Sequence, residues 1–365
     1  MVKVLLVSGS LRVGGLENVV MNCARYMPSS EYSFDFLCWD DRIGEFEEEA
    51  KNLGGRVIKI PSPHSSYYKF YQNIKKIIKT EGPYDVVHSH VFFLSGIVLH
   101  AAHSCGVRTR IAHSHSIKRK NDSTGFRKIY CSIMRKMINK NATVKCACST
   151  ATGRYLYGTE IFDDCGIILP NVIDLSSFEF SLTNRDMIRN EFGIFKEQIV
   201  IGNVGHMLTV KNQSFLLDIF SVFVKNNDAY LMIVGDGPEK GRLTAKISEL
   251  GIADRVILTG VRMDVVKIMS AFDIFVLPSL HEGLPLTIVE SMANGLSYVM
   301  EGSIIAKEIV EFDHCIKVSG YRATDWSEAI SKGIEKGRFD SRMSIEQLEM
   351  FGKENFREVL TKMYK

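Results

Sequence analysis

Two glutamates near the end of the chain flank a segment that can bind an anion. Glu282 and Glu290 are separated by seven residues within PSLHEGLPLTIVESMANG (278–295). An apolar, strand-like run precedes the segment and a helical pattern follows it, so we expect Glu282 in a strand-to-helix loop and Glu290 in the first turns of the helix. The N–H groups of a helix start attract phosphate, and carboxylates accept hydrogen bonds from sugar hydroxyls. These residues predict a site for a phosphorylated polyol, such as a nucleotide sugar.

A lysine lies in a second predicted strand-to-helix loop, GHMLTVKN (205–212). Taken alone, Lys211 is interpreted as an exposed surface lysine, but its place between a strand and a helix favours contact with a diphosphate, and His206 lies five residues earlier. The chain contains no Asp-x-Asp pair of the kind that holds a divalent cation on a diphosphate. We therefore expect Lys211 and backbone amides to neutralise the diphosphate, with no metal and no cofactor.

Four histidines form two His-Ser-His pairs, each placed after a predicted strand: His88, His90, His113 and His115. Strand alternation puts both members of a pair on the same face. Three interpretations stay open, namely a zinc site, core packing, and contact with an acceptor or donor by a general base or hydroxyl-binding imidazole. No carboxylate or cysteine stands beside them in the sequence, which makes metal the least favoured. We assign the four to the acceptor side and take His115 as a catalytic candidate.

A glycine-containing loop, GSLRVGG (9–15), follows the first apolar run of the chain. Its spacing is not G-x-G-x-x-G, so a dinucleotide site is poorly supported. The loop still lies where parallel sheets bind ligands, at the carboxyl end of the first strand. Two interpretations of Gly14 and Gly15 stay open, a ligand contact and a tight turn that needs glycine's conformational freedom.

The composition is that of a soluble globular protein, and the length suggests two domains. The chain has 365 residues and a net charge of +3, which is too small to indicate nucleic-acid binding. No apolar run approaches the length needed to cross a bilayer, and the eight cysteines show no metal-ligand spacing. Alternating strands and helices predict doubly wound parallel sheets. We expect strands at 2–7, 34–38, 56–60, 85–88, 108–113, 144–148, 199–204, 230–234, 255–258 and 273–277, and a strand entering a linker at 168–178.

A basic segment at 117–145 carries nine Lys or Arg residues and one acid, Asp122. Its apolar residues fall at helical spacing, with basic residues on the other face. One interpretation is a core-packed helix with a solvated basic face. The other is an interfacial element that touches anionic headgroups or a lipid-pyrophosphate acceptor.

The ordered motifs resemble glycosyltransferase family 4. Residues 234–296 resemble its signature region, and GGLENVV (14–20), IAHSHS (111–116) and PNVID (170–174) resemble its glycine loop, first-domain histidine motif and interdomain segment. The resemblance covers most of the chain. It implies the GT-B fold, in which two Rossmann-like, doubly wound parallel-sheet domains face an interdomain cleft.

The same resemblance divides the chain and implies a reaction. We expect an acceptor-binding domain at 1–172, a donor-binding domain at 173–340, and a C-terminal helix within 341–365 that returns to the first domain. The implied activity is metal-independent transfer of a hexose from a nucleotide-diphosphate donor, expected to be a UDP-sugar, with retention of anomeric configuration. The implied acceptor is a glycan or an undecaprenyl-linked saccharide in capsule or exopolysaccharide biosynthesis. We expect a cytoplasmic protein, and the interfacial interpretation of 117–145 would place it at the inner face of the plasma membrane.

By position, the resemblance gives Glu290 the ribose hydroxyls, Glu282 the donor sugar and Lys211 the diphosphate. The catalytic candidates are Glu282, Lys211 and His115. The donor-binding candidates are Gly14, Gly15, His206, Lys211, Gly235, Val261, Arg262, Glu282, Gly283, Leu284, Pro285, Leu286 and Glu290.

One residue departs from the family pattern. Members usually carry arginine where His206 stands, and the change removes a permanent charge and a bidentate donor. Two other functions therefore stay open, a nucleotide-sugar 2-epimerase-like isomerase and a non-catalytic nucleotide-sugar-binding protein of the GT-B fold.

Overall fold

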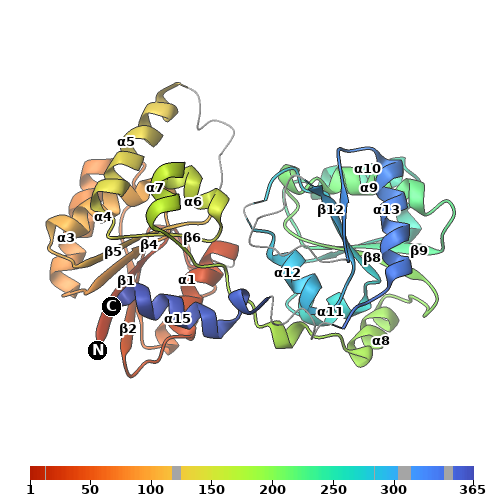
Figure 1. Cartoon of the computed structure of the whole chain (residues 1–365), viewed down its shortest axis with the longest axis horizontal. Helices are drawn as coiled ribbons and strands as arrows, with labels where there is room; N and C mark the ends of the chain where they lie inside the picture. The colour runs from red at the N-terminus through yellow and green to blue at the C-terminus, as the bar shows by residue number, and fades with distance from the viewer. Residues whose placement is uncertain (13, 117–124, 283, 303–313, 341–347) are drawn as a thin grey trace. The chain divides into compact units, whose positions relative to one another are not determined.

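The chain forms two compact units in a computed structural model (Figure 1). Unit 1 comprises Met1–Val172 and Met350–Lys365, and unit 2 comprises Ile173–Glu349. The structure describes residues 1–12, 14–116, 125–282, 284–302, 314–340 and 348–365.

Unit 1 is built on a seven-stranded parallel sheet in the order β3-β2-β1-β4-β5-β6-β7. Every neighbouring pair is parallel, so all the strands end at one edge. The strands are β1 (Val2–Val7), β2 (Tyr32–Cys38), β3 (Arg56–Lys59), β4 (Val86–Ser89), β5 (Thr109–Ser114), β6 (Val144–Ala147) and β7 (Gly166–Ile168).

Helices cover both faces of this sheet because its strands alternate two apolar sides. In β1, Val4 and Leu6 belong to one buried cluster, whereas Leu5 and Val7 belong to the other. The first face packs against α1 (Gly15–Arg25), α2 (Glu47–Asn52) and α15 (Lys353–Tyr364). The second face packs against α3 (Tyr67–Glu81), α4 (Ser95–Ser104), α5 (Gly125–Asn141), α6 (Thr150–Tyr157) and α7 (Thr159–Cys165).

Unit 2 repeats the plan with a six-stranded parallel sheet in the order β10-β9-β8-β11-β12-β13. Its strands are β8 (Ile199–Val204), β9 (Ala229–Val234), β10 (Val256–Gly260), β11 (Ile274–Leu277), β12 (Tyr298–Glu301) and β13 (Cys315–Val318). Its helices are α8 (Leu182–Glu191), α9 (Gln213–Phe223), α10 (Lys240–Glu249), α11 (Val265–Ala271), α12 (Leu286–Ala293) and α13 (Ala323–Lys336).

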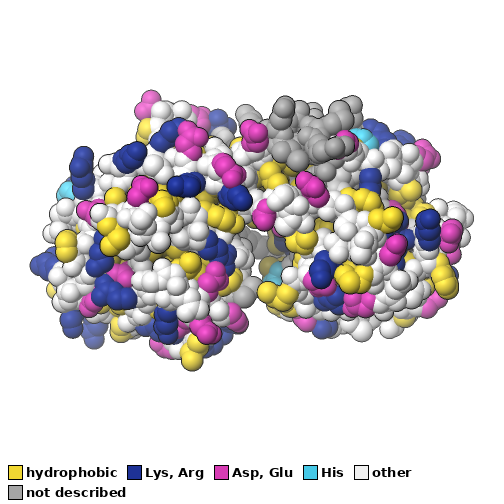
Figure 2. All heavy atoms as spheres, turned by 90° about the horizontal axis from the view of Figure 1, so that it is seen from below, with side chains coloured by type: hydrophobic (Ala, Val, Ile, Leu, Met, Phe, Trp, Pro, Cys, Tyr) yellow, Lys and Arg dark blue, Asp and Glu magenta, His cyan; other side chains and the backbone are white. Residues whose placement is uncertain are grey.

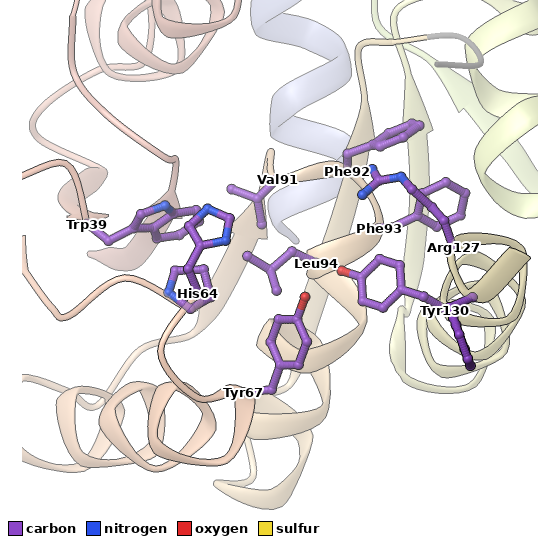
Figure 3. Close-up of a pocket in the computed structure, with 11 residues that line it drawn as sticks. Trp39, His64, Tyr67, Val91, Phe92, Phe93, Leu94, Arg127 and Tyr130 are labelled. Atoms are coloured by element: carbon purple, nitrogen blue, oxygen red, sulfur yellow. The ribbon is translucent and has the colours of Figure 1, made fainter. Parts of the chain in front are cut away.

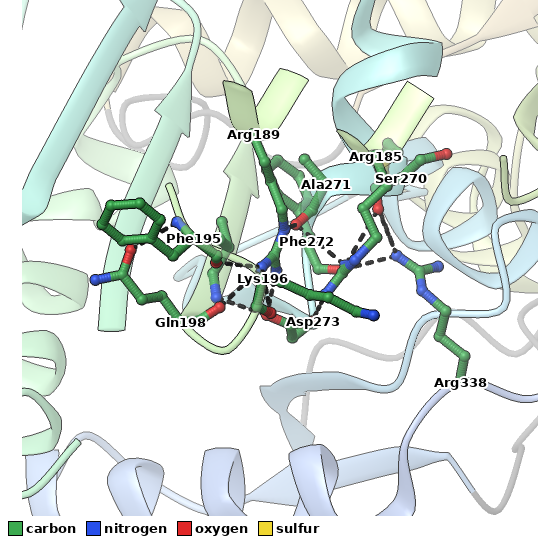
Figure 4. A network of polar contacts seen from close by, with 12 residues as sticks. Arg185, Arg189, Phe195, Lys196, Gln198, Ser270, Ala271, Phe272, Asp273 and Arg338 are labelled. Carbon is green, nitrogen blue, oxygen red and sulfur yellow. Dashed lines mark hydrogen bonds and ion pairs between the residues drawn. The ribbon is translucent and has the colours of Figure 1, made fainter. Parts of the chain in front are cut away.

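Three arginines satisfy the carbonyl groups that α11 leaves free at its end (Figure 4). Arg189 donates to the Ala271 carbonyl at 3.0 Å and to Asp273 at 2.6 Å. Arg338 donates to the Phe272 carbonyl at 2.7 Å, and burial lowers its pKa to about 9. Arg185 completes the network with a 2.5 Å bond to Asp273. The cluster fixes the turn that leads from α11 into β11, before the strand reaches its functional end.

The predicted α/β class with two parallel-sheet units is confirmed, and most predicted strands lie within two residues of observed ones. One prediction is wrong. The stretch 168–178 is not a strand, since β7 ends at Ile168 and a 3-10 turn follows at Leu175–Phe178. No element was predicted for 297–340, which contains β12, β13 and α13.

The surface carries mixed charge. On the face shown in Figure 2, Lys and Arg side chains lie among Asp and Glu side chains, as the small net charge leads one to expect. Within the described part of the chain, no helix combines the length and apolar character that a membrane span requires.

Candidate active site

Three loops of unit 2 meet at the carboxyl edge of its sheet. They follow β8, β9 and β11, which are neighbours in the order β9-β8-β11. Backbone hydrogen bonds join the loops, from Met207 N to Asp236 O at 2.9 Å and from Leu280 N to Val210 O at 2.8 Å. These bonds join the three loops into one surface. Parallel sheets bind their ligands at this edge.

An ion pair joins two of the predicted site residues. The Lys211 Nζ lies 2.8 Å from the Glu282 Oε1, with the two side chains 22% and 10% exposed. The pair links the loop after β8 to the loop after β11. In the free protein the carboxylate compensates the charge of Lys211, so a bound anion would take the place that Glu282 now holds on the ammonium group.

Asn212, which the sequence reasoning missed, holds the same two loops together. It adopts the left-handed region, with φ of 53°, at the start of α9. Its side-chain amide donates to the Pro278 carbonyl at 3.2 Å. Asparagine tolerates this backbone conformation better than most residues, and an asparagine between a predicted strand and helix was the signal available in the sequence.

The GDGP loop after β9 needs glycine for packing. Gly235 has φ of 134°, and a Cβ there would lie 2.2 Å from the Gly205 carbonyl oxygen. A Cβ on Gly237 would lie 2.5 Å from the Met207 carbonyl oxygen. Close approach of two backbones therefore accounts for Gly235 without a ligand.

Helix α12 begins inside the PSLHEGLPLT run, as the sequence predicts. It starts at Leu286 after Pro285, no side chain caps its start, and its first turn has no acidic residue. Leu284 and Pro285 are buried and Leu286 is partly exposed, whereas Gly283 lies outside the described residues. The free N–H groups and helix dipole give this start a positive character.

Glu290 lies one turn into α12 and is partly buried. Burial raises the pKa of its carboxyl group from 4.5 to about 7. Among the described residues, none forms a hydrogen bond or ion pair with this carboxyl group. Ligand hydroxyl groups that donate to it would favour the ionised form.

The remaining donor-side candidates differ in how they are held. His206 is exposed in the loop after β8, and Val261 is 69% exposed. Arg262 is bound on both sides, by Asp264 at 2.8 Å and by Glu191 at 2.5 Å. Since both carboxylates hold its guanidinium, Arg262 shapes the loop after β10. The exposed Val261 is better placed than Arg262 to contact a planar ring of a ligand.

Gly14 and Gly15 in unit 1 do not require glycine's conformational freedom. Gly14 has φ of −171°, which any residue adopts, and Gly15 is not among the residues of positive φ. The tight-turn explanation therefore fails. The Glu17 carboxylate occupies the start of α1, 2.4 Å from where a Cβ on Gly14 would lie.

The structure gathers the four predicted histidines at the carboxyl ends of β4 and β5. The ring centroids of His88 and His90 are 4.2 Å apart, and those of His113 and His115 are 4.0 Å apart. The His90 Nδ1 lies 2.9 Å from the His115 Nε2. The His88 Nδ1 lies 2.9 Å from the hydroxyl of Tyr364 in α15, a partner the sequence gave no means to find.

These histidines are neutral imidazoles. Burial, reinforced by the neighbouring rings, lowers the pKa of His88, His90 and His113 well below 6.5. Burial lowers the pKa of His115 to about 3. A base of such low pKa accepts a proton weakly near neutral pH, so His115 is better suited to hydrogen-bond a hydroxyl group than to remove its proton.

Two sets of described residues bring metal-ligand atoms within 4.8 Å of one another, Cys23 with His88 and His90, and His90 with His113 and His115. The expectation that no cysteine lies nearby was wrong, since α1 brings Cys23 to the cluster. Burial raises the pKa of the Cys23 thiol to about 12. The three-imidazole set has the ligand type that zinc accepts.

Comparison with known proteins agrees with this architecture. The family described as Glycosyltransferase Family 4 matches residues 13–177, and the family described as Glycosyl transferases group 1 matches residues 184–350. A Bacillus subtilis (strain 168) protein named putative glycosyltransferase EpsF is 32% identical over 354 residues, covering 96% of this chain and 92% of that protein.

Two further similarities are more distant. The Escherichia coli UDP-Gal:alpha-D-GlcNAc-diphosphoundecaprenol alpha-1,3-galactosyltransferase is 24% identical over 308 residues, covering 79% of this chain and 76% of that one. The crystal structure of Anabaena HepE in complex with UDP superimposes with a TM-score of 0.84 at 19% identity and 99% coverage of both chains.

The two parallel-sheet units and the similar structures define the GT-B fold. The two family matches and the Bacillus subtilis relative make the protein a glycosyltransferase. Its sequence places it more narrowly. The chain belongs to glycosyltransferase family 4.

Proposed function

We propose that this enzyme is a retaining hexosyltransferase that moves a sugar from a UDP-sugar to a lipid-linked saccharide during assembly of a surface polysaccharide. The observation that carries the proposal is the Lys211–Glu282 ion pair, held on joined loops beside the uncapped start of α12. The names of the E. coli relative and the Anabaena complex, which mention UDP-Gal, a diphosphoundecaprenol acceptor and UDP, support the choice of donor and acceptor class.

The chemical task is to stabilise charge on the departing diphosphate. Lys211 and the start of α12 supply positive charge, and His206 adds a donor in the same loop system. The diphosphate replaces Glu282 as the partner of Lys211, and Glu282 then accepts hydrogen bonds from hydroxyl groups of the donor sugar. Glu290 accepts hydrogen bonds from the ribose hydroxyls. With these contacts the diphosphate needs no metal ion.

Retention does not need a nucleophile from the protein. In a front-face reaction the departing phosphate oxygen takes the acceptor's proton as the new glycosidic bond forms on the face that the phosphate leaves. Neutral His115 is suited to orient an acceptor hydroxyl group by a hydrogen bond. Glu282 accordingly acts in binding and not as a covalent nucleophile.

The test is a donor panel followed by product analysis. UDP-, GDP- and ADP-sugars are incubated with polyprenyl-diphosphate-linked monosaccharides, and products are identified by mass spectrometry and the anomeric coupling constant in NMR. We expect transfer from a UDP-sugar with the donor's anomeric configuration. Inversion, or transfer only from a GDP- or ADP-sugar, contradicts the corresponding part of the proposal.

Because His206 stands where arginine is usual, the same experiment also tests two alternative functions, an isomerase and a non-catalytic binding protein. An epimerised nucleotide sugar formed without acceptor would identify an isomerase. Calorimetric binding of nucleotide sugar without any turnover across the panel would identify a binding protein. Either result would replace the transferase proposal.

A further inference from the structure

A cavity of about 430 Å³ opens in unit 1 at the carboxyl edge of its sheet. Trp39 directly follows β2, His64 follows β3, and Val91 to Leu94 follow β4. Tyr67 at the start of α3, and Phe126, Arg127 and Tyr130 near the start of α5, close the other side. These strands are neighbours in the order β3-β2-β1-β4, so the cavity lies at the edge where such sheets receive ligands.

Most of the lining residues are aromatic, and several of their rings are held by packing. In Figure 3 the rings of Trp39 and Tyr130 stand on opposite sides of the space, with Val91 and Leu94 between them. Tyr67 and Tyr130 stack with centroids 5.9 Å apart, and Trp39 packs edge-on against Phe70 at 5.2 Å. A cavity that combines aromatic rings with polar groups is suited to an amphiphilic ligand, and packed rings lower the cost of ordering its walls.

Phe92 at the cavity adopts an unusual backbone conformation. Its φ is 51°, in the left-handed region that bulky residues seldom enter. Its ring stacks on Tyr155 at 5.9 Å and packs against Phe93 at 4.5 Å. Such conformations persist where the surroundings hold them, often at ligand sites.

Helix α5 extends the apolar lining onto an exposed, positively charged surface. Phe126, Ile129 and Ile133 share a face with Tyr130 and are 92%, 58% and 50% exposed. The helix has five Lys or Arg residues and no acid. Its observed part fits both sequence interpretations, since Met134 and Ile138 pack into the core while the outer face is apolar and basic. An apolar strip bordered by cations is complementary to an anionic amphiphile.

We propose that this cavity binds the phosphate-proximal hydrocarbon of a polyprenyl diphosphate, the lipid part of a lipid-linked acceptor, with Arg127 at its mouth contacting a phosphate. The apolar rings take the first isoprene units, and the α5 strip takes the chain beyond them. The inference rests on the proposed function, because it names what carries the acceptor saccharide to unit 1.

The experiment uses intrinsic fluorescence. The chain has two tryptophans, Trp39 in the cavity wall and Trp326, which is fully buried in unit 2. We expect geranyl diphosphate to change the emission of the wild type and to leave that of Trp39→Phe unchanged. Inorganic diphosphate and maltotriose serve as probes of charge alone and saccharide alone, and we expect neither to change it.

Variants separate the apolar and charged contacts. Tyr130→Ala and Arg127→Ala should each weaken geranyl diphosphate binding at least tenfold. Lys140→Ala, which removes a cation from the far end of the same helix, should leave it within twofold. Circular dichroism checks that each variant is folded.

Three results would overturn the inference: equal responses to geranyl diphosphate and inorganic diphosphate, a response to maltotriose alone, or no response to any probe. Calorimetry with UDP-glucose on the same samples separates this failure from that of the proposed function. If only the cavity assignment is wrong, UDP-glucose still binds. If only the donor assignment is wrong, geranyl diphosphate binds and UDP-glucose does not.

Discussion

Lys211 and Glu282 are each other's partners in the free protein, which explains how two partly buried opposite charges are tolerated at an open sheet edge. Leaving one of them unpaired in this position would cost stability. A donor that brings a diphosphate for the lysine and hydroxyl groups for the glutamate replaces the ion pair without leaving either group unsatisfied. The pair thereby favours ligands that carry both features.

Glu290 predicts a pH dependence of donor binding. Its pKa of about 7 in the free protein should fall when ribose hydroxyls donate to its carboxylate. Binding then releases a proton below pH 7, so affinity should weaken by up to about tenfold per pH unit as pH falls below 7 and change little above it. Calorimetry with UDP-glucose, whose diphosphate does not titrate in this range, measures the effect.

The control for this pH dependence is Glu290→Gln, which should bind more weakly and lose most of the slope below pH 7. An equal slope in both proteins would assign the titration to another group. A flat profile in the wild type would contradict the ribose contact.

Metal removal tests the division of charge in the site. Because Lys211 and the start of α12 supply positive charge to the diphosphate, EDTA should change the transfer rate by less than about twofold. Loss of one contact that stabilises the diphosphate charge would lower the rate far more. Metal content is measured in parallel, since His90, His113 and His115 form a set that zinc accepts. Loss of transfer on EDTA treatment, restored by zinc, would refute metal independence.

Individual site residues could be predicted from the sequence where a charged residue lies in a short predicted loop. Glu282, Glu290 and Lys211 each stand between a clear strand and a clear helix. Cys23 and Tyr364 could not be connected to His88 from the sequence, because the three meet only through packing of α1 and α15 on β4.

Among the elements, α11 depends on the arginines around its end. Arg189 is 3% exposed and donates to carbonyl groups and to Asp273. Arg189→Met should lower the free energy of unfolding of unit 2 by about 3 kcal/mol, because the partly buried Asp273 keeps Arg185 as its only arginine partner among the described residues and several carbonyl groups lose their donor. Urea unfolding followed by Trp326 emission in a Trp39→Phe background measures it.

The matched control is Arg322→Met, which removes an exposed arginine paired with Asp325 three residues on. Its cost should be about 0.5 kcal/mol or less. Similar costs for the two variants would show that the network around α11 does not support unit 2.

Element prediction succeeded where apolar periodicity was regular and failed where turns ended it early. The strands at 2–7 and 199–204 were found to the residue, since each is a mostly apolar run followed by a glycine-containing loop. The run at 168–178 misled because Pro170 and Asp174 break the pairing that its apolar residues suggest. Strands β12 and β13 are short and mix apolar with polar residues, so neither shows a clear strand pattern in the sequence.

For the whole molecule, the end of the chain belongs to unit 1. Helix α15 buries Phe356, Leu360, Met363 and Tyr364 in the same cluster as β1. Leu360→Ala should destabilise unit 1 by about 2–5 kcal/mol through the lost contacts and the cavity left behind. Hydrogen exchange should become faster in β1 and β2 and stay unchanged in β8 and β9.

Glu358→Ala, on the exposed side of α15, is the control and should change exchange in neither unit. Faster exchange in β8 after Leu360→Ala, or no change in β1, would show that α15 does not stabilise unit 1 specifically. The sequence identified the helix but held no signal for the face it covers, which is set by contacts more than 300 residues apart along the chain.

The most direct test of the donor site is the turnover of Lys211→Ala at saturating donor, compared with Lys246→Ala. Lys246 has nearly the same exposure, 23%, and a similar ion pair with Asp218 at 2.6 Å, but it lies in the second half of α10. The Lys211 variant should lose on the order of 100-fold in turnover, because one preorganised charge on the leaving diphosphate is gone. The Lys246 variant should stay within twofold of the wild type. Equal turnover of the two variants would contradict the role of Lys211 and, with it, the placement of the donor.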